Sequence, residues 1–133
     1  MQEYVLGFMF SDDLDSLLLI RKQRPVWQAG RLNGVGGKVE AEESPLYAMI
    51  REFREETGVA HTDWVAFQVL EFPGARVTCF AAASSNALLA ARSTTDEPVC
   101  VIAVGHVPED PVMGLATLVP LAAEALSQSS EAA

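Results

Sequence analysis

The chain has 133 residues, of which 50% are hydrophobic and 20% charged, a composition that fits one folded domain and excludes wholesale disorder. Its 18 acidic and nine basic residues give a formal net charge of -9, so we do not expect it to bind a nucleic-acid polymer. No stretch holds the roughly 18 apolar residues that cross a bilayer and the N-terminus lacks a signal-peptide pattern, so we expect a cytoplasmic protein without membrane contacts.

Two strands are predicted at the start of the chain, over residues 3–10 and 16–23. Both segments are rich in β-branched, aromatic and leucine residues, and the polar residues 11–13 between them are typical of a turn. Residues 24–37 contain a proline and four glycines, which predicts a loop with short extended pieces. Glycines lack a Cβ, so here the backbone is able to approach a ligand closely.

An amphipathic helix is predicted between Ser44 and Gly58. The Ser44 hydroxyl is suited to cap the first turn, and Pro45 occupies the first helical position without losing a hydrogen bond. Gly58 is suited to end the helix in the left-handed conformation. The apolar positions recur with helical spacing and predict one buried stripe: Leu46, Met49, Ile50 and Phe53.

The next elements are predicted to be a hairpin and a short helix. Residues 64–72 and 76–82 have strand composition and flank the turn dipeptide Pro73-Gly74. Residues 86–92 favour a short helix.

The last elements are predicted to be a buried strand over residues 99–107 and a closing helix over residues 115–126. Pro120 lies inside this segment and would fit if the helix began near that residue, because proline is tolerated in a first turn. The order of the elements predicts an α/β fold with a mixed sheet and helices packed on it. We expect a single domain over residues 1–126 and a frayed tail over residues 127–133.

Three glutamates on the predicted helix, Glu52, Glu55 and Glu56, are spaced i, i+3 and i+4 and lie within an arc of about 100°. Like charges at this spacing each cost a few tenths of a kcal/mol, so helix stability does not favour them. Oxygen ligands of this kind suit a hard divalent cation such as Mg²⁺ or Mn²⁺. Arg51 has two possible partners, Glu55 one turn later and Glu43 in the preceding loop.

The glutamates belong to a longer pattern over residues 37–59. Gly37 is followed after five residues by Glu43 and, after seven more, by the run Arg51-Glu52-Phe53-Arg54-Glu55-Glu56-Thr57-Gly58-Val59. This pattern resembles the Nudix box, the 23-residue signature of the Nudix hydrolase family, at every specified position. A chance match has a probability of roughly 10⁻⁹ per start at average composition. The resemblance implies an α/β/α sandwich that hydrolyses a nucleoside diphosphate linked to another moiety.

The resemblance also implies roles for individual residues. The implied ligands of Mg²⁺ or Mn²⁺ are the carboxylates of Glu52, Glu55 and Glu56 and the carbonyl of Gly37. Arg51 and Glu43 are implied to form a structural pair, and Gly58 to close the box helix.

The candidate catalytic residues are Glu52, Glu55, Arg51 and Glu97. Within the family the general base is either a box glutamate or a carboxylate from a later loop. Here these are Glu52 and Glu97, with Asp96 as the rival of Glu97.

Four residues before the box helix are candidate substrate contacts: Asn33, Arg24, Lys38 and Trp27. Residues 30–40 are similar to the corresponding loop of MutT-like enzymes, which implies that Asn33 holds the base; a turn residue is the alternative. Lys38 and Arg24, together with Lys22, are either phosphate contacts or exposed surface charges. Trp27 either stacks on a base or covers the loop.

The activity that this resemblance favours is the cleavage of a nucleoside triphosphate to the monophosphate and pyrophosphate. Two alternatives stay open: hydrolysis of a dinucleotide or nucleotide sugar, and a catalytically silent module that binds a nucleotide. Residues 110–117 lack the Trp and the acidic pair with which mammalian-type members read oxidised purines. The expected partner is a small-molecule nucleotide, and the expected state is a monomer or homodimer.

Overall fold

The computed structural model describes residues 1–132, and its framework is one mixed β-sheet. In chain order the strands are β1 (Gln2–Phe10), β2 (Ser16–Arg21), β3 (Leu32–Asn33), β4 (Val35–Lys38), β5 (Val65–Phe72), β6 (Ala75–Ala83) and β7 (Val99–Ala103). The seven strands follow the order β3-β2-β1-β6-β5, with β4 paired to β1 and β7 paired to β2. The β1–β6 pair is parallel and the other pairs are antiparallel, which confirms the predicted mixed sheet.

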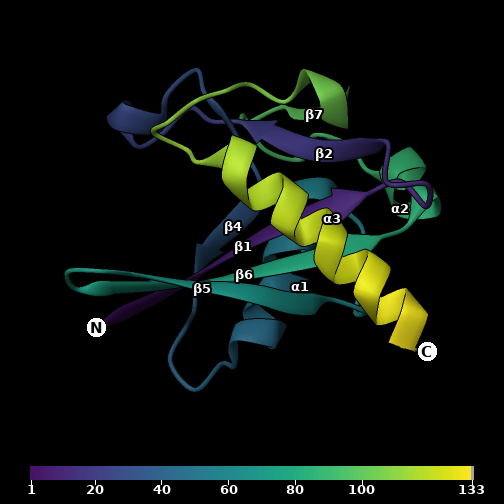
Figure 1. Cartoon of the computed structure of the whole chain (residues 1–133). Coiled ribbons are helices and arrows are strands. Elements are labelled where there is room, and N and C mark those ends of the chain that lie inside the picture. The colour runs from purple at the N-terminus through teal and green to yellow at the C-terminus, as the bar shows by residue number, and fades with distance from the viewer. Residues whose placement is uncertain (133) are drawn as a thin grey trace.

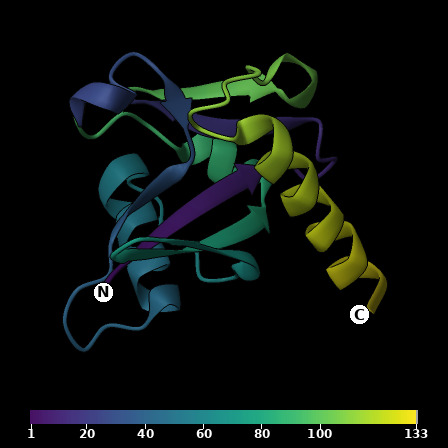
Figure 2. The same cartoon turned by 60° about the vertical axis from the view of Figure 1, so that its left-hand side comes forward.

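Helices cover both faces of this sheet (Figure 1, Figure 2). Helices α1 (Pro45–Thr57) and α2 (Ser85–Ala90) pack on one face, and α3 (Leu115–Ala132) crosses the other. This arrangement confirms the predicted α/β/α sandwich. Within residues 1–132, no helix combines the length and the apolar character that a bilayer crossing requires.

The alternation of side chains along the central strands divides the core into two layers. Val5 and Met9 of β1 pack with α1, whereas Phe8 and Phe10 pack with α3. Successive residues of a strand point to opposite faces, so an apolar strand of this kind serves both helices. Full burial of each such side chain contributes about 1.5–3 kcal/mol, which makes the central strands the main source of stability.

One edge of β1 is shared by two strands, and this division opens the sheet. β6 pairs with β1 along its whole length, from Gln2 to Phe10. On the other edge, β4 pairs with the first half, Tyr4–Gly7, and β2 pairs with Met9 and Phe10 at the end. Strands β4 and β2 therefore diverge from a common partner, and the loop between them lies over the divergence.

Helix α1 has the termini that the sequence predicts. The Ser44 hydroxyl accepts a hydrogen bond from Tyr47 N at 3.2 Å, and Gly58 adopts φ 78° and donates its N–H to Arg54 O at 2.8 Å. The buried face differs from the predicted stripe, because it consists of Ala48, Met49, Phe53 and Thr57. Leu46 is 40% exposed, so its predicted place in the core is wrong. At 100° per residue Leu46 lies on the same face as Phe53 and Thr57, so its exposure follows from its position in the first turn of α1.

The β5–β6 hairpin and the helix α2 confirm the elements predicted for the middle of the chain. The predicted buried strand over residues 99–107 is shorter and more exposed than expected. β7 ends at Ala103, a 3₁₀ turn follows at Val104–His106, and Val101 is 50% exposed. β7 pairs with β2 at the border of the sheet, and an edge strand leaves part of its apolar residues in solvent.

Helix α3 begins at Leu115, five residues before Pro120, which therefore lies inside the helix. The predicted start at residue 115 is confirmed, although Pro120 lacks the N–H that would bond to the preceding turn. Burial of four residues against the sheet compensates: Leu115, Leu118, Val119 and Ala122. The segment predicted as a frayed tail is helical over residues 127–132, and residue 133 lies outside the described part of the chain.

Candidate functional site

Arg51 of α1 is the centre of an ion-pair network that joins the helix to the preceding loop. Its Nε and Nη2 donate to the two Glu43 carboxylate oxygens at 2.8 and 2.9 Å, and Nη2 also donates to Lys38 O at 2.9 Å. Its Nη1 donates to Glu52 Oε1 at 2.9 Å and to Glu55 Oε2 at 3.3 Å. The expected Arg51–Glu43 pair is present, and the same guanidinium also orients two glutamates of the box.

Glu43 is held in its ionised form by this network. It accepts the two hydrogen bonds from Arg51 and a third from Glu40 N at 2.9 Å. These contacts lower the pKa of Glu43 from 4.5 to about 2, with the Arg51 side chain as the largest cause. The pair thus depends on pH only in strong acid.

We expect Glu43→Gln to reduce the free energy of unfolding by about 1–2 kcal/mol at pH 7, because solvent screens part of this partly exposed interaction. The folded pKa of Glu43 lies below its ordinary value of 4.5, so ionised Glu43 stabilises the fold above that pH, and this contribution is lost as the pH falls toward 2. Urea unfolding at pH 7 and pH 2.5 measures the difference, which should fall to about a quarter at the lower pH. An equal loss at both pH values contradicts the assignment.

Glu52 lies directly against the glycine loop. A Cβ built on Gly37 would lie 2.4 Å from Glu52 Oε1, so only glycine leaves room for this carboxylate. Burial raises the pKa of Glu52 and outweighs the opposing effect of its contact with Arg51. The carboxylate of Glu52 and the backbone of β4 therefore form one continuous surface.

Glu56 is a largely buried carboxylate among other acidic groups. Burial raises its pKa to about 7, and the nearby charges of Glu52, Glu97 and Glu55 raise it further, against a lowering by Lys22. Among the side-chain hydrogen bonds of the described residues, none reaches Glu56. The described residues also hold no set of three or more acidic, His or Cys side chains already converged as a metal site. Glu52 and Glu55 instead accept hydrogen bonds from Arg51.

Glu97 anchors the segment that follows β2. It is 6% exposed and accepts hydrogen bonds from Lys22 Nζ at 3.0 Å, Gln23 N at 2.7 Å and Arg24 N at 3.3 Å. Burial acts to raise the pKa of Glu97, but these hydrogen bonds outweigh it and the net shift is downward. Glu97 is therefore ionised and saturated by donors, and Lys22 is fixed between Glu97 and the box helix.

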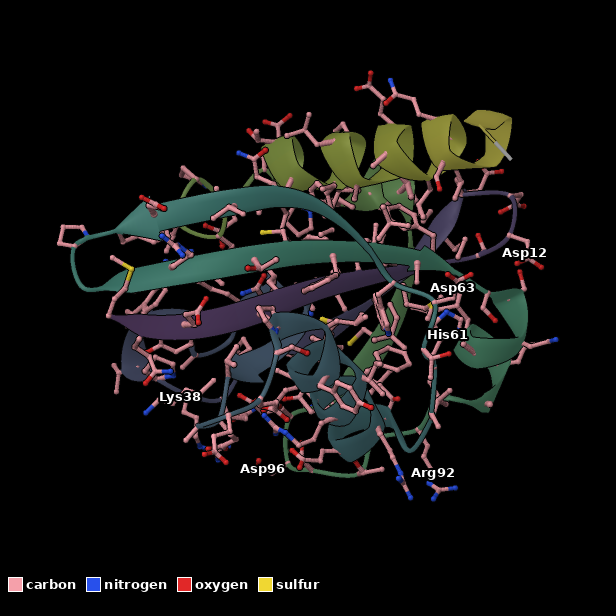
Figure 3. The ribbon with its side chains drawn as sticks, turned by 90° about the horizontal axis from the view of Figure 1, so that it is seen from below. Asp12, Lys38, His61, Asp63, Arg92 and Asp96 are labelled. Atoms are coloured by element: carbon pink, nitrogen blue, oxygen red, sulfur yellow. The ribbon has the colours of Figure 1, made fainter. Side chains whose placement is uncertain are left out.

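Arg24 and Asp96 pair with each other at the surface. Two hydrogen bonds join the guanidinium to the carboxylate, and both side chains are more than 60% exposed, at 63% and 64%. Asp96 is labelled in Figure 3, on the same side of the sheet as α1. Neither residue lines the cavity described below, so the structure does not group Arg24 with the other candidate substrate contacts.

A cavity of about 680 Å³ lies on the side of β4 that faces away from the glutamates of α1, where strands β4 and β2 diverge. Its polar and loop lining comes from Tyr4, Lys22, Trp27, Gln28, Asn33, Gly36, Gly37 and Lys38. Its apolar wall includes Leu6, Leu70, Phe72, Val77, Met113 and Leu118. Gly37 lines this cavity and also lies against Glu52, so β4 joins the cavity to the glutamates.

Three of the four candidate substrate contacts line this cavity: Asn33, Lys38 and Trp27. Asn33 Oδ1 accepts a hydrogen bond from Gly34 N at 2.8 Å, so this residue also has the turn function considered as its alternative. Trp27 is 59% exposed at the mouth. Met113 is 8% exposed and belongs both to the wall and to the α3 core layer.

Sequence reasoning did not identify Gln28 or Asp110 as residues of this region. Gln28 lies in the 3₁₀ turn Val26–Gln28 and carries no sequence signal. Asp110 receives two hydrogen bonds from Arg31 Nη1, across 79 residues of sequence. A pairing at that separation leaves no local pattern to detect.

Comparison with known proteins adds independent support. The family model of the NUDIX domain matches residues 2–99. The 8-oxo-dGTP diphosphatase of Escherichia coli (strain K12) is 32% identical over 66 residues, which cover 48% of this chain and 51% of that protein. The chain thus spans about half the length of this curated relative.

Solved structures show the same fold. A MutT structure, from work on Aliivibrio salmonicida and Vibrio cholerae, aligns with a TM-score of 0.70 at 25% identity, covering 92% of this chain and 98% of that one. The NUDIX domain of Shewanella oneidensis NrtR, complexed with ADP ribose, aligns with a TM-score of 0.72 at 19% identity, covering 93% and 87%. With the box, the fold and a domain match that extends over most of its length, the chain belongs to the Nudix hydrolase family.

Proposed function

We propose that the protein is a divalent-metal-dependent pyrophosphohydrolase that cleaves a nucleoside triphosphate to the monophosphate and pyrophosphate. The observation that carries this proposal is the position of Gly37, which lines the cavity and also lies against Glu52. A nucleotide bound in the cavity is thereby brought next to the glutamates of α1. Family membership supports hydrolysis, and the likeness to the E. coli 8-oxo-dGTP diphosphatase supports a triphosphate substrate.

The acidic residues fit a divalent cation, which the Nudix family generally uses. The raised pKa values of Glu52 and Glu56 reflect carboxylates that are buried near one another and lack enough positive charge. The room that Gly37 leaves for Glu52 also exposes the glycine backbone beside it. The residues that would hold Mg²⁺ or Mn²⁺ are Glu52, Glu55 and Glu56, with the carbonyl of Gly37.

A divalent cation held there would supply positive charge to the pyrophosphate and would lower the pKa of the attacking water. The side chains of the protein bind the substrate and accept the proton of that water. Glu52 is better suited than Glu97 as the proton acceptor, because its pKa is raised and one of its oxygens is not engaged by Arg51. Glu97 is occupied by three donors, so we assign it the positioning of Lys22 and the segment up to Arg24.

The cavity supplies both parts of nucleotide recognition. Lys22 and Lys38 line it near the glycine loop and offer positive charge to a phosphate chain. Asn33 offers an amide to a base edge, and Trp27 offers an aromatic face for stacking. The apolar wall excludes water from the remaining surface of the base.

A substrate panel tests the proposal. Canonical and oxidised nucleoside triphosphates are incubated with the protein in Mg²⁺ and in Mn²⁺, and pyrophosphate release is measured separately from phosphate release. We expect metal-dependent pyrophosphate release from at least one triphosphate and none in excess chelator. Release of inorganic phosphate in place of pyrophosphate contradicts the proposed cleavage, and nucleotide binding without turnover supports the silent module.

A dinucleotide or nucleotide sugar is the second candidate substrate. The NrtR NUDIX domain with the same fold binds ADP ribose, which makes this class a necessary part of the panel. ADP ribose, NADH and diadenosine polyphosphates therefore accompany the triphosphates. Faster turnover of one of these compounds than of every triphosphate would favour the second candidate.

A further inference from the structure

One residue pair, Arg31 and Asp110, joins two segments that line the cavity. Arg31 Nη1 donates to both Asp110 carboxylate oxygens, at 2.8 and 2.7 Å, and Arg31 Nε donates to Trp27 O at 3.1 Å. The guanidinium thus holds the carbonyl of the Trp27 turn and the carboxylate of a distant loop at the same time. The Arg31 contact also lowers the pKa of Asp110, so the pair is ionic at neutral pH.

Asp110 in turn fixes the segment that leads into α3. Its Oδ1 accepts a hydrogen bond from Val112 N at 3.0 Å, and its carbonyl accepts one from Gly114 N at 2.9 Å. These contacts hold the turn that carries Val112 and Met113, both of which line the cavity. The Asp110 carboxylate therefore connects Arg31 to the part of the cavity wall that Val112 and Met113 form.

The two segments that this pair joins lie far apart in the sequence. Trp27 and Gln28 come from the 3₁₀ turn Val26–Gln28, Val112 and Met113 come from the segment before α3, and all four line the cavity. Two of these residues, Trp27 and Val112, are at least half exposed, so burial alone does not fix their positions. A bridge between the two segments is needed to keep a constant distance between them.

We propose that Arg31 and Asp110 are positioning residues that set the width of the nucleobase end of the cavity and so determine affinity for the base. This inference rests on the proposed nucleotide substrate. The side chains of the pair form no hydrogen bond with Lys22, Lys38 or a box glutamate. The one contact with Lys22 is between backbones, from Lys22 N to Arg31 O at 2.8 Å, and a side-chain substitution leaves it in place. Loss of the pair therefore weakens the binding of the base and leaves the binding of the phosphate chain and the rate of the chemical step unchanged.

A purely structural role makes a different prediction. Arg31 is 39% exposed at the side chain, and ion pairs of such exposure contribute little to the free energy of unfolding. Loss of a purely structural pair would change thermal stability and would not affect ligands with a base differently from ligands without one. Loss of a positioning pair weakens the binding of ligands that carry a base and leaves the binding of base-free ligands unchanged.

The test compares Arg31→Lys, Asp110→Asn and the double variant with the wild-type protein. Lysine keeps the charge but cannot join Trp27 O and Asp110 at once, and asparagine removes the charge with little change in shape. Glu71→Gln is the control, because Glu71 also forms an ion pair with an arginine, Arg76 in the β5–β6 hairpin, and neither residue lines the cavity. Thermal unfolding verifies that each variant is folded.

Isothermal titration gives the dissociation constants of the four deoxynucleoside monophosphates and, in Mg²⁺, of inorganic tripolyphosphate. We expect Arg31→Lys and Asp110→Asn each to bind the best monophosphate about tenfold more weakly than the wild-type protein. The double variant should bind it no more weakly than the single variant with the lower affinity. Tripolyphosphate affinity should stay within twofold of wild type. In turnover assays, KM for the triphosphate should rise about tenfold while kcat stays within twofold.

Three outcomes overturn the inference: unchanged monophosphate affinity in the variants, an equal loss for tripolyphosphate, and no binding of any monophosphate to the wild-type protein. If the wild-type protein turns over triphosphates and the variants bind monophosphates as tightly as it does, only the positioning role of Arg31 and Asp110 is refuted. If the wild-type protein turns over no nucleotide, the proposed function is refuted, and the monophosphate affinities still test the positioning role.

Discussion

Replacing Glu56 by Gln is expected to lower metal-dependent turnover by at least about 1,000-fold, or about 4 kcal/mol of transition-state stabilisation. In the same variant the metal-free fold is expected to become more stable at pH 8. Both effects have one cause, since Glu56 is a buried carboxylate beside other carboxylates. A bound cation requires Glu56 to be ionised, and in the absence of the cation burial makes this ionised form unfavourable.

The sign of the stability change follows from the pKa of Glu56. The folded-state value is about 7, compared with the ordinary 4.5, so the folded protein binds this proton more tightly than the unfolded chain. The contribution of Glu56 to the free energy of unfolding is therefore fully present below about pH 4.5 and is lost as the pH rises through 7. Gln does not ionise, so Glu56→Gln should raise the free energy of unfolding by about 1–3 kcal/mol at pH 8 and change it little at pH 4.5.

Urea unfolding in chelator, at pH 4.5 and pH 8, measures this difference. Adding Mg²⁺ should reverse the order of stability, because a ligand that binds the folded state stabilises only the protein that retains its site. Glu124→Gln is the control, since Glu124 is an exposed glutamate on α3. If Glu56→Gln retained more than a tenth of wild-type turnover, the metal assignment would be wrong.

Two adjacent glycines are expected to give opposite results when changed to alanine. A Cβ at Gly36 would lie 2.0 Å from Val5 O, which belongs to the backbone of β1. A backbone atom in a paired strand cannot move aside, so we expect Gly36→Ala to cost more than about 4 kcal/mol. Domains of this size have about 5–15 kcal/mol of stability, so the variant should be largely unfolded at 37 °C.

Gly37→Ala should fold and lose activity. Its Cβ would lie 2.4 Å from Glu52 Oε1, which is the end of a flexible side chain. The carboxylate can turn away at a cost of about 1 kcal/mol, but it then leaves its position beside β4. We expect kcat to fall about 100-fold, the effect of a displacement of about 1 Å at a catalytic group.

Circular dichroism melting curves and steady-state kinetics separate these two results. Gly105→Ala is the control, because nothing lies within 4 Å of its Cβ position and its φ is not in the left-handed region. A folded Gly36→Ala protein with normal melting would show that β1 and β4 are not paired as described. A fully active Gly37→Ala enzyme would remove Glu52 from the proposed catalytic set.

The sequence predicted the elements whose signals are local. Helix α1 was predictable from Ser44 to Gly58 because capping residues and apolar spacing act within a few residues. The β-branched, aromatic and leucine composition of β1 and β2, with a turn between them, predicted the central strands for the same reason. The start of α3 at Leu115 was also predicted, and burial against the sheet maintains this helix in spite of Pro120. Its extension beyond residue 126 was not predicted.

The sequence by itself determined the family and the candidate glutamates, because the box is a contiguous pattern on one helix and its preceding loop. Only the tertiary structure decided how the charges are paired. Lys22 pairs with Glu97, Arg24 with Asp96 and Arg31 with Asp110, at separations of 75, 72 and 79 residues. Coulomb attraction depends on distance in space and on burial, and neither is written in the spacing of residues along the chain.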